Sequence, residues 1–204
     1  MCLMVLTTCT VFSCSDRGNE SSSVGESSGV LLVTDDEDYQ TIQEKARKAE
    51  EERIKAEEER KAAEERRAAE LKAQGLVDLG LPSGTLWRDK NEEGGFYTYD
   101  EAVSQFGSRL PSKEQWEELK AECQWWWTGS GHKVTGPNGN SITLPAAGCR
   151  YCGGSVKYVG SSGLYWSSTP KDSENAWYLY FRSGGWYMSY YSRCYGNSVR
   201  LVQD

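Results

Sequence analysis

The sequence predicts an α+β domain over residues 76–204, with two helices followed by several short antiparallel strands. Each helix start carries a capping box, in which Thr98 precedes Glu101 by three residues and Ser112 precedes Gln115 by three. The later stretches GLYWSST, AWYLYF and SVRLV are rich in β-branched and aromatic residues, as strands are. Two helices followed by short strands are typical of an α+β layout.

A core is expected from the second helix and a hairpin. Trp116, Leu119 and Cys123 recur at helical spacing and predict one buried face. The stretch HKVTGPNGNSITLPAAG alternates around Gly-Pro-Asn-Gly-Asn, which predicts a β-hairpin. We also expect Trp166 inside the domain and a structural role for Arg200.

A long charged helix is expected before the domain, over residues 41–75, with Gly75 as its stop signal. Favourable Glu–Lys pairs four residues apart support it: Glu44–Lys48, Glu51–Lys55 and Glu57–Lys61. Its seven-residue period raises the alternative of a coiled coil. Alanine fills one position of the repeat, but arginine fills the position four later, whereas a coiled coil needs two apolar seams. An isolated helical stalk, roughly 50 Å long, is therefore favoured.

Residues 1–14 resemble a bacterial lipoprotein signal. A short apolar run ends in Val11, Phe12, Ser13 and Cys14, and it is too short to cross a bilayer as a helix. The resemblance implies that the chain is cleaved before Cys14 and that lipid is attached to this thiol. The run departs from the pattern because no Lys or Arg precedes it, and a plain apolar leader is the alternative. The expected location is the outer membrane or cell surface.

Residues 15–40 are expected to form a flexible tether, because their Ser, Gly and acidic residues cannot bury enough apolar area to order the chain. They carry seven acids and one arginine, so they hold most of the net charge of −7. Residues 76–204 are nearly neutral, with 13 acids and 12 bases. Without a dense basic patch, nucleic acid is an unexpected partner.

Five ordered blocks carry a family resemblance: DLGLPSGTLW, RLPSKEQWEEL, KVTGPNGNSITLPAAG, GLYWSSTPKDSENAWYLYF and NSVRLV. They resemble the Fibrobacter major paralogous domain over essentially all of residues 76–204. That family is similar to the formylglycine-generating-enzyme branch of the C-type lectin fold, and its members are typically surface lipoproteins. Some are variable proteins of diversity-generating retroelements. The resemblance implies a C-type-lectin-like domain that binds a ligand through its C-terminal surface.

The stretch WYLYFRSGGWYMSYYSRCY, residues 177–195, holds nine of the chain's 24 aromatic residues and no acid. Its mixture of Tyr, Ser, Gly and Arg is similar to that of an antibody paratope. The resemblance further implies that retroelement diversification produces a limited set of residue types. The expected ligand-binding residues fit that set: Tyr178, Tyr180, Arg182, Gly185, Tyr187, Ser189, Tyr190, Tyr191, Ser192, Cys194, Tyr195 and Asn197.

Strand alternation places Trp177, Leu179 and Phe181 on one face, suited to a core, and Tyr178 and Tyr180 on the other. We expect the tyrosine face at the surface, in contact with a protein or glycan on another cell, a phage or a host. The alternative is an invariant structural protein in which these aromatic residues simply pack.

A relative of the formylglycine-generating enzyme is a further alternative, which would need a redox-active cysteine pair that binds metal. Cys149 and Cys152 have ligand-like spacing, but no second CxxC follows them. Cys123 and Cys194 could complete a zinc site or form disulfides, and four thiols allow three pairings. We expect no enzymatic activity and no cofactor.

Three further features are expected to carry no chemistry. His132, the only histidine, is expected in a solvated loop. Asp172, Glu174 and Asn175 could ligate calcium, but the lectin signatures Glu-Pro-Asn and Trp-Asn-Asp are absent, so no metal is expected. At least one indole of the Trp-Trp-Trp run at 125–127 should be exposed, because neighbouring strand residues face opposite sides.

Overall fold

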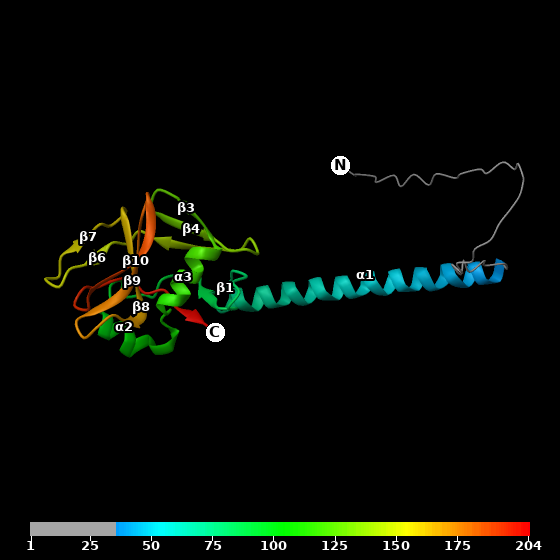
Figure 1. Cartoon of the computed structure of the whole chain (residues 1–204), viewed down its shortest axis with the longest axis horizontal. Coiled ribbons are helices and arrows are strands. Elements are labelled where there is room, and N and C mark those ends of the chain that lie inside the picture. The colour runs from blue at the N-terminus through cyan, green and yellow to red at the C-terminus, as the bar shows by residue number, and fades with distance from the viewer. Residues whose placement is uncertain (1–35) are drawn as a thin grey trace, which may run out of the picture. The chain divides into compact units, whose positions relative to one another are not determined.

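The computed structural model describes residues 36–204 (Figure 1). The expected signal sequence over residues 1–14, with the expected lipid-attachment site Cys14, lies outside the described residues, as does most of the expected tether. Helix α1 spans Asp36–Ala73, so residues 36–40, which we expected in the tether, are helical. The acidic run there explains the earlier start, because Asp and Glu are favoured in the first turn of a helix.

Helix α1 is solvated along nearly all of its described length. Glu44 and Lys48 form one of the expected ion pairs, at 3.0 Å, and Glu57 and Lys61 form another, at 3.5 Å. The third pair is exchanged, because Glu51 pairs with Arg47 and Lys55 with Glu59. Gly75 ends the helix in the left-handed region, with φ +66°, where a residue without Cβ is favoured. Within residues 36–204, no helix is both long and apolar enough to cross a membrane.

Residues 76–204 form a mixed α+β domain with several small antiparallel sheets, as the sequence predicts. The helices are α2, Tyr99–Phe106, the 3₁₀ turn η1, Gly107–Arg109, and α3, Lys113–Glu122. One sheet, in the order β1–β2–β11, joins Leu76–Asp78, Leu86–Arg88 and Val202–Gln203. The last strand therefore closes onto the start of the domain. The expected strand SVRLV is only partly formed, since β11 begins at its final residue.

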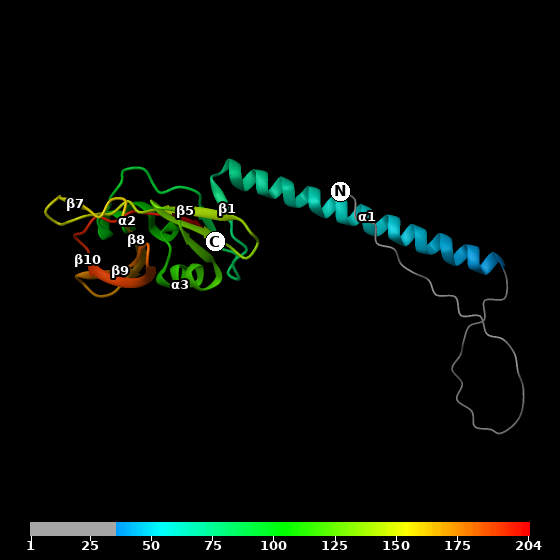
Figure 2. The ribbon, with the colours of Figure 1, turned by 90° about the horizontal axis from the view of Figure 1, so that it is seen from above.

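Along the chain, the strands of the other sheets come between α3 and β11. A three-stranded sheet in the order β3–β4–β5 contains Gln124–Trp127, Gly131–Thr135 and Ser141–Pro145. A small hairpin pairs β6, Cys149–Arg150, with β7, Val156–Lys157. The third sheet, in the order β10–β9–β8, contains Ser162–Pro170 (β8), Asn175–Arg182 (β9) and Gly185–Ser192 (β10). These three strands run side by side in both views (Figures 1 and 2).

The local predictions for the helices are confirmed. Both capping boxes form, with Thr98 and Glu101 bonding reciprocally at α2 and Ser112 and Gln115 at α3. The expected face of α3 is buried, and its Trp116 side chain is fully enclosed. The predicted hairpin is also confirmed as β4 and β5.

The β8–β9–β10 sheet separates two hydrophobic clusters. Along β9, Leu179 and Phe181 belong to the first cluster, with α3 and the β3–β4–β5 sheet, whereas Ala176 and Tyr178 belong to the second, with α2. Strand β8 alternates in the same way, and Trp166 is buried in the second cluster as expected. Because successive strand residues point to opposite faces, a strand enclosed on both sides has buried residues at almost every position.

Arg200 is fully buried and has the expected structural role. Its guanidinium donates to the side-chain oxygen of Asn91 and to the main-chain oxygens of Arg88 and Thr143, at 2.6–3.0 Å. Burial lowers the pKa of Arg200, because desolvation disfavours the charged form. The side chain thus ties the last residues of the chain to β2, β5 and the loop that follows β2.

We predict that Arg200→Met lowers the free energy of unfolding by about 2–4 kcal/mol, because two buried carbonyls and Asn91 lose their donor. Urea denaturation followed by circular dichroism measures the change. Arg182→Met, at an exposed position, is the matched control and should stay within about 0.5 kcal/mol of the wild type. A loss at Arg200 no larger than that of the control would contradict the structural role.

Candidate binding surface

The outer strand of the third sheet, β10, presents the most exposed part of the aromatic segment. Tyr187 and Tyr190 are each 51% exposed and Tyr191 is 41% exposed, although all three lie in a regular strand. Strand β10 is at the sheet edge, and its only strand partner among residues 36–204 is β9. Because side chains alternate along β10, Tyr187 and Tyr191 lie on the face of the second cluster and Tyr190 lies on the face of the first.

Four tyrosines on the face of the second cluster form the C-terminal tyrosine surface: Tyr180, Tyr187, Tyr191 and Tyr195. Tyr180 and Tyr187 are cross-strand neighbours with ring centroids 5.1 Å apart. Tyr191 contacts Tyr195 edge-on at 4.2 Å and lies 6.2 Å from the buried ring of Tyr178. Edge-on pairs suit the quadrupoles of aromatic rings, so the contacts with Tyr178 and Tyr195 stabilise the position of the Tyr191 ring.

On the opposite face, Tyr190 packs beside Trp177, with ring centroids 5.5 Å apart. The ammonium of Lys171 lies 5.5 Å from the Tyr190 ring, and that of Lys113 lies 4.8 Å from the Trp177 ring. Both distances fit cation–π attraction. Tyr190 therefore belongs to a second, smaller aromatic patch with lysines around it.

The expected ligand-binding residues fall into three groups. The exposed ones are Arg182, Tyr187, Tyr190, Tyr191 and Cys194, and the half-buried ones are Tyr180, Gly185, Ser189, Ser192 and Tyr195. The prediction is wrong for Tyr178, which is 7% exposed and packs against Trp166, and for Asn197, which is 1% exposed. Alternation alone placed Tyr178 outside, but the second cluster covers that face of β9.

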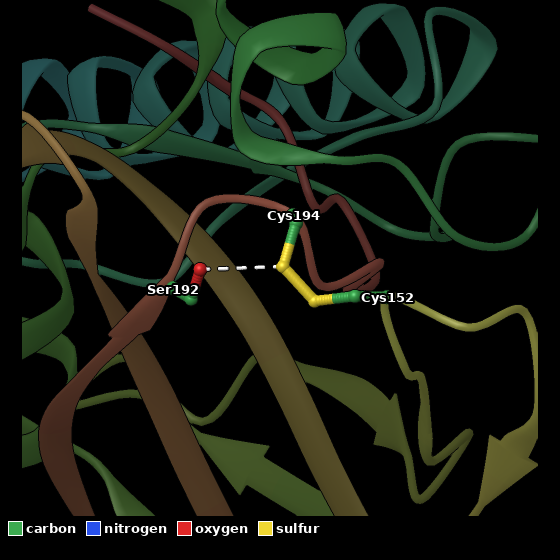
Figure 3. The surroundings of a disulfide bond; sticks show 3 residues. All are labelled: Cys152, Ser192 and Cys194. Carbon is green, nitrogen blue, oxygen red and sulfur yellow. Dashed lines mark hydrogen bonds between the residues drawn. A yellow bond between two sulfur atoms is a disulfide. The ribbon is translucent and has the colours of Figure 1, made fainter.

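Cys194, one of the expected ligand-binding residues, is bonded to Cys152, which realises the disulfide alternative for this thiol (Figure 3). The bond joins residues 42 apart in the sequence, with their Cα atoms 5.2 Å apart. Ser192 Oγ lies 3.2 Å from the Cys194 sulfur (Figure 3). The disulfide ties the β6–β7 hairpin to the loop that follows β10.

Cys123 and Cys149 are the free thiols among the described residues, and both are buried. Desolvation raises the pKa of Cys123 to about 11, with a smaller contribution from Glu118 and Glu122. Desolvation also raises the pKa of the Cys149 thiol. Cys149 is not paired with Cys152, so the CxxC motif is divided between a buried thiol and a disulfide. Among residues 36–204, no group of His, Cys, Asp and Glu is arranged to hold a metal ion.

The expectation of a solvated His132 is wrong, because its side chain is 2% exposed. Strand β4 begins at Gly131, so His132 alternates with the buried Val134 and points inward. Its ring lies 5.1–5.7 Å from those of four aromatic residues: Trp125, Trp127, Phe181 and Trp186. Its Nε2 donates to the main-chain oxygen of Arg182 at 3.1 Å, which holds the β9–β10 turn against the β3–β4–β5 sheet.

In the Trp-Trp-Trp run of β3, the indole of Trp126 is 74% exposed, as the alternation of strand residues predicts.

Asp172, Glu174 and Asn175, which were considered as calcium ligands, lie at the turn between β8 and β9. Asp172 Oδ1 accepts from the main-chain nitrogens of Glu174 and Asn175 and from the Asn175 side chain, at 2.8–3.0 Å. These hydrogen bonds hold the pKa of Asp172 below its usual value. The carboxylate therefore has a turn-forming role.

The sequence reasoning missed two tyrosines, Tyr151 and Tyr158, which lie beside the C-terminal surface. The Tyr151 ring meets Tyr195 at 5.1 Å, and its hydroxyl lies 3.0 Å from that of Tyr158. Their only signal in the sequence is that two aromatic residues flank a Gly- and Ser-rich loop near Cys152. This local pattern does not predict that Tyr151 and Tyr158 lie beside the loop that contains Tyr195.

Residues 113–202 match the model of a domain of unknown function (DUF8237). No curated protein matches the chain, and no solved structure matches it. The matched stretch runs from α3 to β11, so it contains His132, the disulfide and the whole aromatic segment. The description of that domain names no activity.

We predict that Cys152→Ser with Cys194→Ser lowers the free energy of unfolding by about 3–4 kcal/mol, because an open loop gains chain entropy in the unfolded state. Urea denaturation with and without dithiothreitol measures this. The reductant should destabilise the wild-type chain by a similar amount and leave the double variant unchanged. Equal stability of wild type and variant under oxidising conditions would contradict the prediction.

We also predict that iodoacetamide at pH 8 leaves Cys123 and Cys149 unmodified in the folded chain. A raised pKa keeps each thiol protonated at this pH, and burial blocks access to it. Peptide mapping by mass spectrometry before and after unfolding in urea measures the labelling. Labelling of either thiol in the folded chain, at the rate seen after unfolding, would show that it is accessible.

Proposed function

We propose that residues 76–204 form a C-type-lectin-like, ligand-binding domain that acts through the exposed tyrosines of its C-terminal segment. The observation that carries the proposal is the exposure of Tyr187, Tyr190 and Tyr191 on one edge strand. The same segment buries Leu179 and Phe181 completely, so it has both a core-forming and an outward part.

The chemistry of the outward part suits recognition of another molecule. Tyrosine offers a large, amphipathic contact area with only two side-chain torsions to fix, and neighbouring Ser and Gly adapt to the ligand. Arg182 lies on the same face of β9 as Tyr180 and is exposed. Tyr and Arg are enriched among residues that dominate binding energy. The target is a protein or glycan on another cell, a phage or a host surface.

The division between buried and exposed positions also fits a segment that is rewritten by a retroelement. Changes at Tyr187 or Tyr191 would alter the surface and leave the two clusters in place. Tyr178 and Asn197 are excluded from the proposed binding set, because their side chains are enclosed. Cys194 is assigned to the disulfide.

Display at the cell surface is the other half of the proposal. The lipoprotein-like ending at Cys14 supplies the lipid anchor, and the Ser- and Gly-rich tether with the charged α1 supplies a spacer. Labelling with radioactive palmitate, compared between the wild-type chain and Cys14→Ser, tests this half. Lipid attached equally to both chains would contradict it.

We predict that Tyr187→Ala and Tyr190→Ala each weaken binding at least about tenfold while lowering the free energy of unfolding by no more than about 1 kcal/mol. The reason is that each ring is half exposed and contacts mainly one other ring. Targets come from glycan arrays and panels of surface proteins screened with the Cys14→Ser chain, and urea denaturation supplies the stability.

Tyr178→Ala is the matched buried control and should lose about 3–5 kcal/mol of stability. Losses of that size at Tyr187 and Tyr190, with no ligand on broad panels, would favour the alternative of a structural protein with packed aromatic residues.

A further inference from the structure

We propose that the binding surface does not end with the C-terminal segment but continues onto the β6–β7 hairpin and the loop after it, with Tyr151 and Tyr158 as contact residues for a protein partner. The disulfide Cys152–Cys194 holds the two halves together. This inference rests on the proposed function and extends its site. Three independent observations carry it: a continuous row of rings, a clamp between the halves, and a strained tyrosine.

The row of rings crosses from one chain segment to the other without a break. Tyr191 meets Tyr195 at 4.2 Å, Tyr195 meets Tyr151 at 5.1 Å, and Tyr151 meets Tyr158 at 6.4 Å. The Tyr151 and Tyr158 hydroxyls lie 3.0 Å apart. Tyr158 is 52% exposed, as much as Tyr187 on β10. A partner seated on Tyr191 and Tyr195 would therefore also meet the hairpin.

The clamp consists of the disulfide and a pair of main-chain hydrogen bonds beside it. Arg150 and Gly196 exchange hydrogen bonds in both directions, at 2.8 and 2.7 Å. A Cβ on Gly196 would lie 2.9 Å from Arg150 Nε and from Phe96 Cβ, so the close approach needs glycine.

At its base the hairpin is anchored by Cys149, which is buried in the second cluster, and by Tyr151, which packs against that cluster. Beyond Tyr151 it has little else to hold it in place. Its strands are two residues each, and residues 152–161 are all exposed. Elements with few buried apolar contacts open at low cost. The disulfide therefore fixes the orientation of Tyr151 relative to Tyr195, in addition to its effect on global stability. A surface fixed before binding loses less entropy when the partner arrives.

Tyr158 has a backbone conformation that its side chain disfavours. Its φ is +65°, and among the described residues it is the only one other than glycine with a positive φ. Glycine would adopt this conformation without the clash between Cβ and the carbonyl oxygen that other residues incur. Its carbonyl accepts from the main-chain nitrogens of Ser161 and Ser162, which fixes the turn. An exposed, bulky side chain at a position suited to glycine indicates that the ring has a use other than stability.

The charge around this surface indicates the chemistry of the partner. Arg182 and Lys157 are exposed and form no ion pair with any carboxylate among residues 36–204. The other two arginines of these segments are neutralised, since Arg150 lies 3.8 Å from Glu101 and Arg193 lies 3.7 Å from Asp100.

The aromatic segment 177–195 contains no acidic residue. Lys157 precedes Tyr158 directly, and Arg182 lies two residues after Tyr180. Exposed tyrosines together with an arginine are also the composition of paratopes that bind proteins. The partner class is therefore a protein or peptide with acidic residues next to an apolar or aromatic one.

The test uses the full chain carrying Cys14→Ser, oxidised, as bait for a phage-displayed library of random peptides. The dissociation constants of synthetic peptides from the selection are then measured by biolayer interferometry. The variants are Tyr158→Gly, Cys152→Ser with Cys194→Ser, and Tyr187→Ala. Trp126→Ala, an exposed aromatic residue on β3, is the matched control.

We expect the selection to yield acidic peptides. These peptides should bind Tyr158→Gly and the double cysteine variant at least about tenfold more weakly than they bind the wild type, and they should bind Trp126→Ala as tightly as the wild type. The melting temperature of Tyr158→Gly should equal or exceed that of the wild type, because glycine relieves the strained φ. This separates loss of a contact from loss of the fold, even where the cysteine variant is unstable.

The inference is overturned when Tyr187→Ala weakens the binding of the peptides but Tyr158→Gly and the double cysteine variant bind them as tightly as the wild type does. The proposed function then stands with a smaller site. Peptides that ignore Tyr187 and Tyr158 alike, or a selection that enriches none, would overturn the proposed function together with the inference. A marked fall in the melting temperature of Tyr158→Gly would assign that ring to packing.

Discussion

The alternation of side chains along β9 is the constraint on which the rest of the domain depends. Leu179 and Phe181 point into one hydrophobic cluster and Tyr178 into the other, so both faces of this strand, which is the central one of its sheet, are covered. Its partner β10 occupies one edge of the sheet, where no other strand of the described residues pairs with it. The tyrosines of β10 lie on both faces of the sheet and extend into solvent. The β9–β10 hairpin therefore contains one buried strand and one exposed strand. Edge strands of this kind usually carry protection against unwanted pairing.

Features set by neighbouring residues could be predicted from the sequence, and features set by distant segments could not. Capping boxes and the β4–β5 hairpin depend on a few adjacent side chains, and each was predicted correctly. Burial of Tyr178 depends on α2, which lies far away in the sequence. His132 was misplaced because the start of β4 decides whether it points in or out. Which cysteines pair is a matter of chain topology, so the bond from Cys152 to Cys194 could not be chosen from spacing.

The separation of buried from exposed positions would allow one segment to serve both stability and the proposed recognition. The two clusters and the buried Arg200 hold the scaffold, whereas Tyr187, Tyr190 and Tyr191 each remain at least 41% exposed. Binding residues placed on a rigid scaffold can change with little effect on the fold. The disulfide belongs to both roles, because it closes a long loop and sets the position of the hairpin beside Tyr195.

The central claim is that the exposed tyrosines of β10, and not the packed aromatic residues beside them, carry the function. Sequencing the DNA that encodes residues 163–204 across a natural population tests it most directly. We expect replacements to concentrate at Tyr187, Tyr190 and Tyr191 and to spare the enclosed Phe181, with a near-copy of the segment and a reverse transcriptase gene nearby. Exposed tyrosines as invariant as Phe181, with no such repeat, would contradict a diversified binding surface.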